Sequence, residues 1–193
     1  MKRIGILGGT FDPPHIGHLL MAEEARIKMK LDEVWWMPNR IPPHKKKDSS
    51  TTTEDRIRMV EAMTDQHPDY LLCDIELNRE GLSYTADTMK EVTGKFPNHH
   101  FFFIIGADSL QTLGSWYKID QLSSLVSFVV IQRPGYEMSE LKSPVNAKIY
   151  IIEGPTIDVS SSLIREMIEV DNVNRFLLVN DVYEMIKEYH LYE

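Results

Sequence analysis

Two patterns of apolar positions alternate along the chain. Short runs rich in Ile, Val and Phe predict β-strands, and the segments between them repeat their apolar residues at helical spacing. The expected strands are residues 3–7, 33–37, 70–77, 100–105, 128–131 and 148–152. The expected helices are residues 17–30, 53–65, 85–95, 108–113, 119–125, 161–168 and 181–190. At the start of the helix at 53–65, Thr51 and Glu54 have the spacing of a capping box.

This alternation is typical of an α/β fold. Strands that alternate with helices form a parallel sheet covered on both faces, so we expect a doubly wound, Rossmann-like parallel sheet. The run 101–105 is apolar at every position, which predicts a strand near the centre of that sheet. A chain of 193 residues has the length of one domain, so residues 1–193 are expected to fold as one. The order of the strands does not follow from the sequence.

Composition and charge narrow the function classes. With 42% hydrophobic and 26% charged residues, the chain is ordinary for a globular protein. Its 21 basic and 29 acidic residues give a net charge of -8, which argues against a nucleic-acid partner. A few local cations and N–H groups can still hold one triphosphate. The net charge leaves open whether the chain forms a homo-oligomer.

The expected cellular location depends on membrane-spanning and signal segments. No stretch approaches the ~18 apolar residues of a membrane span, and residues 1–8 do not resemble a signal peptide, so a cytoplasmic location without a membrane partner is expected. The single cysteine, Cys73, lies in an apolar run and cannot form an internal disulfide. We expect a buried, inert thiol there.

The first expected strand runs into a glycine-rich turn, GGTFDPPHIGH, at residues 8–18. Glycines after a strand let a ligand approach the backbone, and the next helix presents unpaired N–H groups to an anion. We therefore expect a phosphate site that includes Gly8, Gly9, Thr10 and Phe11. The turn lacks the Gly-Lys-Ser/Thr of a Walker loop and the GxGxxG spacing of a dinucleotide fold, which excludes both classes.

His15 and His18 stand three residues apart at the start of the following helix, so both imidazoles can project toward one small volume. Beside a phosphate site, two imidazoles can donate hydrogen bonds to phosphate oxygens, and this is the role that we expect. A zinc site is the alternative. A zinc ion would need a third ligand, and none is evident nearby. Asp12 is close in sequence, but it precedes two prolines that restrict its reach.

A second candidate lies far away in sequence, at VSSSLIR, residues 159–165. The hydroxyls of Ser161 and Ser162 can bind phosphate at a helix start. Arg165, one turn further along, can form a fork to phosphate oxygens. Helix capping alone also explains the serines, so on these residues both explanations stay open.

Taken together, GGTFDPPHIGH and SSSLIR resemble the paired signature, GxFDPxHxGH and ISSTxIR, of the nucleotidyltransferase superfamily with an HxGH motif. Val159 and Ser162 depart from the commoner Ile and Thr, but they keep the apolar and hydroxyl character. The superfamily includes adenylyltransferases for nicotinate mononucleotide, nicotinamide mononucleotide and phosphopantetheine, and also cytidylyltransferases. The resemblance implies that the first strand is central in the sheet.

The middle of the chain resembles one branch, the bacterial nicotinate-nucleotide adenylyltransferases, over nearly the full length. The matching segments are PPHK at 42–45, SYT at 83–85, IGAD at 105–108, WYK at 116–118 and RPG at 133–135. Phosphopantetheine adenylyltransferases are shorter and lack this set. The resemblance implies that ATP and nicotinate mononucleotide are the substrates, and that nicotinate adenine dinucleotide and pyrophosphate are the products, in NAD biosynthesis.

The same resemblance assigns the remaining candidate residues. The ATP and phosphate site would include Lys45, Gly106 and Asp108. The nicotinate-nucleotide site would include Ser83, Tyr84, Thr85, Trp116, Tyr117 and Arg133. A cationic pyridine ring that bears a carboxylate needs an aromatic face and N–H donors at a helix start, which agrees with this set. The alternatives are that Trp116 and Tyr117 are core or lid residues and that Asp108 is a helix N-cap.

The implied mechanism requires no general base, because the acceptor phosphate is already an anionic nucleophile. His15, His18 and Arg165 would donate to the phosphates, with His18 nearest the α-phosphate. Mg²⁺ would bridge phosphate oxygens with few protein ligands. Two alternatives remain: a preference for nicotinamide mononucleotide, and a nucleotide-binding regulator without catalytic activity.

Overall fold

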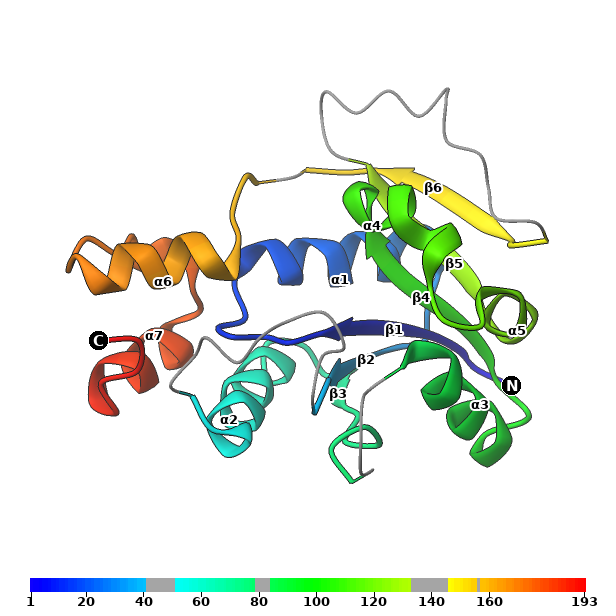
Figure 1. The fold of residues 1–193 in the computed structure, drawn as a ribbon, viewed down its shortest axis with the longest axis horizontal. Helices are drawn as coiled ribbons and strands as arrows, with labels where there is room; N and C mark the ends of the chain where they lie inside the picture. The colour runs from blue at the N-terminus through cyan, green and yellow to red at the C-terminus, as the bar shows by residue number, and fades with distance from the viewer. Residues whose placement is uncertain (41–50, 79–83, 133–145, 156) are drawn as a thin grey trace.

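The computed structural model of the protein describes residues 1–40, 51–78, 84–132, 146–155 and 157–193 (Figure 1). Its strands are β1 (Arg3–Gly9), β2 (Glu33–Pro38), β3 (Tyr70–Leu72), β4 (His100–Gly106), β5 (Ser127–Gln132) and β6 (Ile149–Glu153). Its helices are α1 (Ile16–Met29), α2 (Thr53–Thr64), α3 (Thr85–Lys95), α4 (Ala107–Thr112), α5 (Ile119–Leu125), α6 (Ser161–Glu169) and α7 (Asn180–Glu188), with short 3-10 helices η1 (Leu113–Ser115) and η3 (Arg175–Leu177). Within the part of the chain that the structure describes, no helix is long and apolar enough to cross a membrane.

All six described strands form one parallel sheet, in the order β3-β2-β1-β4-β5-β6. Ile4 of β1 lies opposite Glu33 of β2 on one side and Phe101 of β4 on the other. The chain runs outward from β1 to β3 and returns to the centre at β4, so the strand order reverses between β1 and β4. This is the doubly wound, Rossmann-like sheet that the sequence predicts, and ligands of such sheets bind beyond the carboxyl ends at the reversal.

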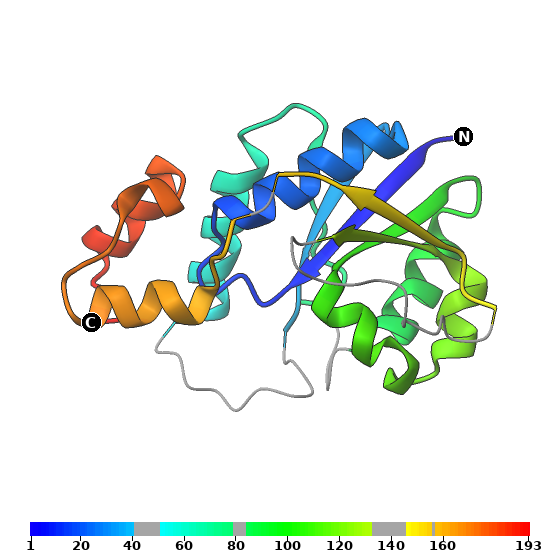
Figure 2. The ribbon, with the colours of Figure 1, turned by 90° about the horizontal axis from the view of Figure 1, so that it is seen from above.

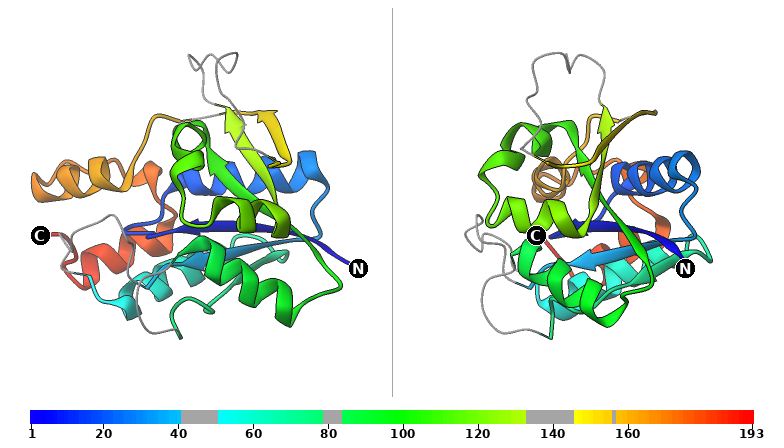
Figure 3. Two further views of the ribbon diagram at one scale, coloured as in Figure 1. Left: turned by 45° about the vertical axis from the view of Figure 1, so that its right-hand side comes forward. Right: turned by 90° about the vertical axis from the view of Figure 1, so that its right-hand side faces the viewer.

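Alternate residues of the central strand β4 face two separate apolar cores. Phe102 and Ile104 pack with residues of α1, α2, α6 and α7. Phe101, Phe103 and Ile105 pack with residues of α3, α4 and α5. Figure 1 shows α1 and α3 on opposite sides of β1, and Figure 3 shows α4 and α5 beside β4 and β5. Both faces of the strand are covered, which confirms the central position predicted for the run 101–105.

One strand is shorter than the apolar run predicted. The sequence favoured a strand over residues 70–77, but β3 ends at Leu72. The Cys73 N–H still donates to the Trp36 carbonyl at 2.8 Å, and the chain then closes a turn. Cys73 and Ile75 join the core on the α3 side without belonging to a strand, so the apolar run reports burial there. Burial raises the pKa of the Cys73 thiol to about 11, in agreement with the inert thiol expected.

The capping pair at the start of α2 is one residue further along than predicted. Thr52 is the N-cap, and its hydroxyl accepts the Asp55 N–H at 3.1 Å while the Asp55 carboxylate accepts the Thr52 N–H at 2.9 Å. The prediction of Thr51 with Glu54 is therefore wrong. The Thr51 hydroxyl is buried and donates to the Asp12 carboxylate at 2.6 Å. Two adjacent threonines can cap equally well, and the buried carboxylate decides between them.

The helices α6 and α7 lie to one side of the sheet, next to the start of α1 (Figure 2). Val182 and Ile186 of α7 share an apolar core with Met59 of α2. After α7, Leu191 and Tyr192 are also buried. The packing of α7 thus brings the end of the described chain next to the loop that follows β1.

Candidate active site

A cavity of about 760 Å³ lies at the carboxyl ends of β1, β4 and β5. Arg165 is not among the described residues that line it, and its guanidinium donates to the Asp12 carbonyl at 2.8 Å. The predicted residues Lys45, Ser83 and Arg133 lie outside the described residues, so their place in the site stays a prediction. All the other predicted site residues line the cavity: Gly8, Gly9, Thr10, Phe11, His15, His18, Tyr84, Thr85, Gly106, Asp108, Trp116, Tyr117, Ser161 and Ser162.

The rings of His15 and His18 lie against each other at the start of α1. His15 is the N-cap and His18 the third residue of the helix, so both side chains leave the same turn. Their ring centroids are 3.8 Å apart with 34° between the planes, as the spacing indicated. The His18 Nδ1 accepts the His15 N–H at 3.1 Å. This bond puts the proton of a neutral His18 ring on Nε2 and makes that atom a donor.

The backbone of the loop after β1 is sharply bent at Phe11. Phe11 has a φ of 53°, in the left-handed region, although it carries a buried aromatic side chain. Its ring lies edge to face with His18 at 5.1 Å and packs on Trp36 at 5.5 Å. A Cβ on Gly9 would lie 3.1 Å from the Phe11 ring, so a side chain there would press on the ring and glycine allows its close approach. A bend of this kind persists only where the surrounding contacts hold it.

Strong contacts converge on Asp12, in the middle of the same loop. Its carboxylate oxygen Oδ1 accepts the Thr51 hydroxyl at 2.6 Å and the Tyr192 hydroxyl at 2.7 Å. Its backbone carbonyl accepts the Arg165 guanidinium at 2.8 Å. Burial, and then the neighbouring Asp12 charge, raise the pKa of Tyr192. The phenol therefore keeps its proton and stays a donor.

Arg56 of α2 supports the loop from another direction. Its guanidinium donates to the carbonyls of Thr10 and Asn39 at 2.9 Å and 2.8 Å. The side chain is buried, and desolvation lowers the pKa of Arg56 while the Asp12 charge opposes that shift. These bonds join the loop after β1 to the segment after β2, so a buried cation fixes the distance between the two.

The three serines at the start of α6 have different roles. Ser160 is the N-cap, and its hydroxyl accepts a backbone N–H of the first turn at 3.1 Å. The Ser161 hydroxyl donates to the Pro13 carbonyl at 2.8 Å. The Ser162 hydroxyl accepts an N–H of Arg165 at 3.3 Å. Capping explains Ser160 alone, and the first turn of the helix still offers N–H groups to an anion.

Aromatic side chains form the other half of the cavity wall. The rings of Tyr84 and Tyr117 lie 4.5 Å apart and are tilted by 36°. Trp116 packs edge to face on Phe103 of β4 at 6.1 Å. Tyr117 is 47% exposed and Trp116 packs half-buried against the core on the α3 side, so neither is a fully buried core residue; the alternative that they are lid residues stays open. Tyr84 is the N-cap of α3, which places Thr85 at the start of a helix in the same wall.

Asp108 lies in the wall between the two halves. Gly106 holds the N-cap position of α4, so the alternative interpretation of Asp108 as the N-cap is wrong. The Asp108 carboxylate folds back over this glycine, because a Cβ on Gly106 would lie 2.5 Å from its Oδ1. A side chain at 106 would therefore displace the Asp108 carboxylate, which stays a candidate contact for a bound ligand.

Comparison with known proteins identifies the family. A cytidylyltransferase-like family model matches residues 6–167. A probable nicotinate-nucleotide adenylyltransferase of Bacillus cytotoxicus is 48% identical, with 100% of each chain covered. The chain belongs to the nicotinate-nucleotide adenylyltransferase family. Another probable member, from Oceanobacillus iheyensis, is 44% identical over 100% of this chain and 97% of the relative.

A solved structure shares the fold of this family member. The nicotinic acid mononucleotide adenylyltransferase of Plasmodium falciparum, complexed with NaAD, superposes with a TM-score of 0.83. The two chains are 24% identical, and the match covers 100% of this chain and 98% of that one. At this identity the likeness establishes the fold.

In this member of the nicotinate-nucleotide adenylyltransferase family, the loop between β1 and α1 is named the phosphate loop after the role expected for it. The residues that hold this loop were not predicted from the sequence. Arg56 could have been found from the sequence, because it lies four residues before Val60 on the apolar face of α2. A cation on a buried face needs hydrogen-bond acceptors. Thr51 was assigned to the capping box instead. Tyr192 gave no signal, since no periodic pattern includes it.

Few of the described side chains are placed to hold a metal ion. Among the described residues, no group of three or more His, Cys, Asp and Glu could hold a metal ion. The zinc alternative for His15 and His18 therefore finds no third ligand in the part of the chain that the structure covers. Two carboxylates line the described part of the cavity wall, those of Asp108 and Glu76, and so small a set fits an ion whose other ligands come from a bound substrate.

Proposed function

We propose that this chain transfers the adenylyl group of ATP to nicotinate mononucleotide, giving nicotinate adenine dinucleotide and pyrophosphate. The observation that carries the proposal is the division of one cavity. His15, His18 and the start of α6 line one half, and Trp116 and Tyr117 line the other. Such a cavity can hold a polyphosphate and a flat ring together. The names of the relatives from Bacillus and Oceanobacillus support this substrate pair and a place in NAD biosynthesis.

The reaction exchanges one P–O bond for another. An oxygen of the nicotinate mononucleotide phosphate attacks the α-phosphorus of ATP, and the bond to the bridging oxygen breaks, so that pyrophosphate leaves. The attacking oxygen already carries charge, and therefore no group of the protein has to remove a proton. The protein aligns the two phosphates and offsets the negative charge that grows in the transition state.

The loop and the start of α6 supply the donors for that charge. Nε2 of His18 would donate to the α-phosphate, and His15 beside it to a neighbouring oxygen. The N–H groups of Ser161 and Ser162 would hold the β- and γ-phosphates. Arg165 has five N–H donors, and its bonds to the loop and to Ser162 leave others for phosphate. Lys45 would add a further charge.

The aromatic half would bind the nicotinate ring. Trp116 and Tyr117 offer apolar faces to a cationic pyridine, and the first N–H groups of α3, at Tyr84 and Thr85, can donate to its carboxylate. Ser83 and Arg133 would complete this half.

Magnesium would be held mainly through ATP. The donor set in the cavity wall provides few protein ligands, and Mg²⁺ commonly keeps several waters and binds substrate phosphates. When bound, the ion would neutralise phosphate charge. The chain's own residues would still set the position of the α-phosphate.

The decisive measurement is pyrophosphate release by the purified chain with ATP and magnesium. Nicotinate mononucleotide, nicotinamide mononucleotide and phosphopantetheine are supplied separately, and His18→Ala is compared with the control His99→Ala, on a residue outside the cavity wall. We expect release with nicotinate mononucleotide, loss of about 10²–10³ in kcat in His18→Ala, as for removal of one transition-state donor, and little change in the control.

The other outcomes separate the alternatives. Comparable release with nicotinamide mononucleotide would show that the site does not select the acid. Release with phosphopantetheine alone would contradict the assignment of the aromatic half. No pyrophosphate release with any of the three acceptors, combined with measurable ATP binding, would favour a nucleotide-binding regulator.

A further inference from the structure

Two hydroxyl donors meet on a single oxygen of Asp12. Thr51 precedes α2 and Tyr192 follows α7, and their hydroxyls lie 2.6 Å and 2.7 Å from Oδ1. All three residues are buried. A buried carboxylate needs such donors, because an unpaired charge in the interior is costly. Segments far apart in the sequence therefore converge on one atom of the phosphate loop.

The position of Asp12 connects this atom to the site. Asp12 lies behind the cavity wall, whereas its neighbours Phe11 and His15 line it. Phe11 has the strained φ of 53° and packs against the ring of His18. A shift of Asp12 would therefore change the placement of both histidines.

The backbone after α7 is sharply bent on both sides of Leu191, at His190 and at Tyr192. His190 and Tyr192 have φ values of 50° and 67°, which are unfavourable for residues with a Cβ. Between them, Leu191 is buried, and its N–H donates to the Ile186 carbonyl at 3.0 Å. Two such conformations close together indicate that the packing constrains the position of the Tyr192 hydroxyl.

We propose that Tyr192 is a positioning residue for adenylyl transfer: through Asp12 it holds the loop between β1 and α1 in the geometry that His15 and His18 need. This inference rests on the proposed function. Tyr192 does not line the cavity, so its loss should lower kcat through misplaced donors and should change substrate binding much less.

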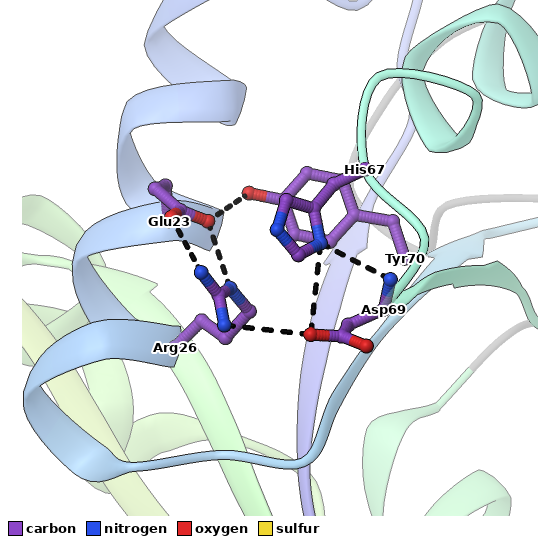
Figure 4. Close-up of polar contacts among 5 residues, drawn as sticks. All are labelled: Glu23, Arg26, His67, Asp69 and Tyr70. Carbon is purple, nitrogen blue, oxygen red and sulfur yellow. Dashed lines mark hydrogen bonds and ion pairs between the residues drawn. The ribbon is translucent and has the colours of Figure 1, made fainter.

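A second buried tyrosine provides a matched control. The Tyr70 hydroxyl donates to the Glu23 carboxylate at 2.8 Å, and Tyr70 is 5% exposed, close to the 6% of Tyr192. Figure 4 shows this tyrosine beside Glu23 and Arg26 of α1, with His67 and Asp69 from the segment before β3. The described cavity wall includes none of these residues. Tyr70→Phe therefore removes the same chemical contact without reaching the phosphate loop.

The experiment compares Tyr192→Phe, Tyr70→Phe and the natural chain in steady-state pyrophosphate release with ATP and nicotinate mononucleotide. We expect Tyr192→Phe to lower kcat about tenfold with the KM of ATP changed less than about threefold, whereas Tyr70→Phe keeps both within about twofold. Thr51→Val removes the other donor on the same oxygen and should lower kcat in the same direction. Unchanged kcat in Tyr192→Phe, or an equal fall in Tyr70→Phe, would overturn the proposal.

Hydrogen exchange of the backbone amides of residues 9–12 and 15, measured without substrate, gives a readout that does not depend on activity. Faster exchange in Tyr192→Phe and Thr51→Val, but not in Tyr70→Phe, supports the positioning role. Equal exchange in all variants overturns it. If the natural chain releases no pyrophosphate, the proposed function fails, and the exchange result still reports separately on the contact between Tyr192 and the loop.

Discussion

The two halves of the cavity are built by different means. The half that would bind the phosphates, here the phosphate half, is lined by His15, His18 and the start of α6. It is fixed by hydrogen bonds from segments far away in sequence, of which the bond from Tyr192 to Asp12 spans 180 residues. The aromatic half, which would bind the nicotinate ring and is here the ring half, rests on contacts between aromatic side chains, Tyr84 with Tyr117 and Trp116 with Phe103. Directional bonds fix atoms to a fraction of an ångström, whereas aromatic contacts provide area and tolerate small shifts.

This difference suggests a division of labour. Interactions that are stronger in the transition state than in the ground state accelerate the chemical step, and those that are equal in both only bind. The phosphate half contains the donors whose position matters at the moment of transfer. We therefore expect changes there to lower kcat and changes in the ring half to raise KM.

The largest effect should come from Arg165→Ala. Its guanidinium holds the Asp12 carbonyl and is expected to donate to phosphate, so its loss removes a donor and a support of the loop together. We expect kcat to fall by about 10²–10³, as for removal of one transition-state donor. Steady-state pyrophosphate release measures it, with Arg175→Ala as a control, because Arg175 contacts Tyr183 and Asn180 outside the cavity wall.

A rise in the KM of nicotinate mononucleotide with unchanged kcat in Arg165→Ala would contradict the expected difference between the two halves of the cavity. It would mean that the phosphate half contributes uniform binding only. Circular dichroism of both arginine variants checks that α6 remains folded.

A somewhat smaller loss is expected from Gly17→Ala. A Cβ at this position would lie 3.0 Å from His15 Nδ1 and 3.0 Å from the side chain of Val159, so the imidazole has to move. Misplacement of a catalytic group by a fraction of an ångström should lower kcat about 10- to 100-fold. Gly94→Ala on α3 is the matched control, since its Cβ meets nothing within 4 Å. It should keep full activity and gain about 0.5–1 kcal/mol of stability. Equal activity in the two variants would contradict the requirement for a fixed imidazole.

The fold followed from the sequence wherever local pattern decides it. Helix 85–95 was predicted with both of its ends, because its amphipathic pattern and its flanking residues agree. The strand predicted over 70–77 ends at Leu72, because apolar side chains report burial and not the hydrogen bonds that define a strand. The capping residue was misplaced by one position, since Thr51 and Thr52 are equivalent until a third group, Asp12, is near.

In the functional site, too, some contacts could be predicted from the sequence and others could not. His15 and His18 could be paired from the sequence because both lie on one turn of helix. The partnership of Asp12 with Thr51 and Tyr192 depends on how α2 and α7 pack, and periodicity gives no information on packing partners. A sequence thus predicts contacts within one element far better than contacts that join several.

The ring half can be tested with Trp116→Ala. Removal of an aromatic face from a cationic ring should raise the KM of nicotinate mononucleotide about tenfold and leave kcat within about threefold. Trp35→Ala is a suitable control, because Trp35 packs on Phe96 and Phe101 outside the cavity wall. A large fall in kcat in Trp116→Ala at saturating substrate would mean that the ring half also fixes the reacting atoms.

The smallest effect on activity is expected for the network of Glu23, Arg26 and Tyr70 (Figure 4). Like the contacts around Asp12, this network joins a carboxylate, an arginine and a tyrosine, but it lies outside the cavity wall. The hydrogen bond from Arg26, with that from Tyr70, lowers the pKa of Glu23 to about 2, against the opposing effect of burial. In the unfolded chain the carboxyl has its ordinary pKa of about 4.3. The stabilisation is therefore complete above about pH 4.3 and is lost as the pH falls toward 2.

We expect Glu23→Gln to lower the free energy of unfolding by about 1 kcal/mol at pH 7, since the carboxylate is partly exposed and solvent weakens its ion pair. Urea unfolding at pH 7 and pH 3 should show a smaller difference between variant and natural chain at the lower pH. The kcat should not change, because these bonds hold α1 to the segment before β3 and not to the loop. A fall in kcat would mean that any loosening of α1 reaches His15 and His18, and the phosphate half would then owe its geometry to the whole helix and not to the contacts on Asp12.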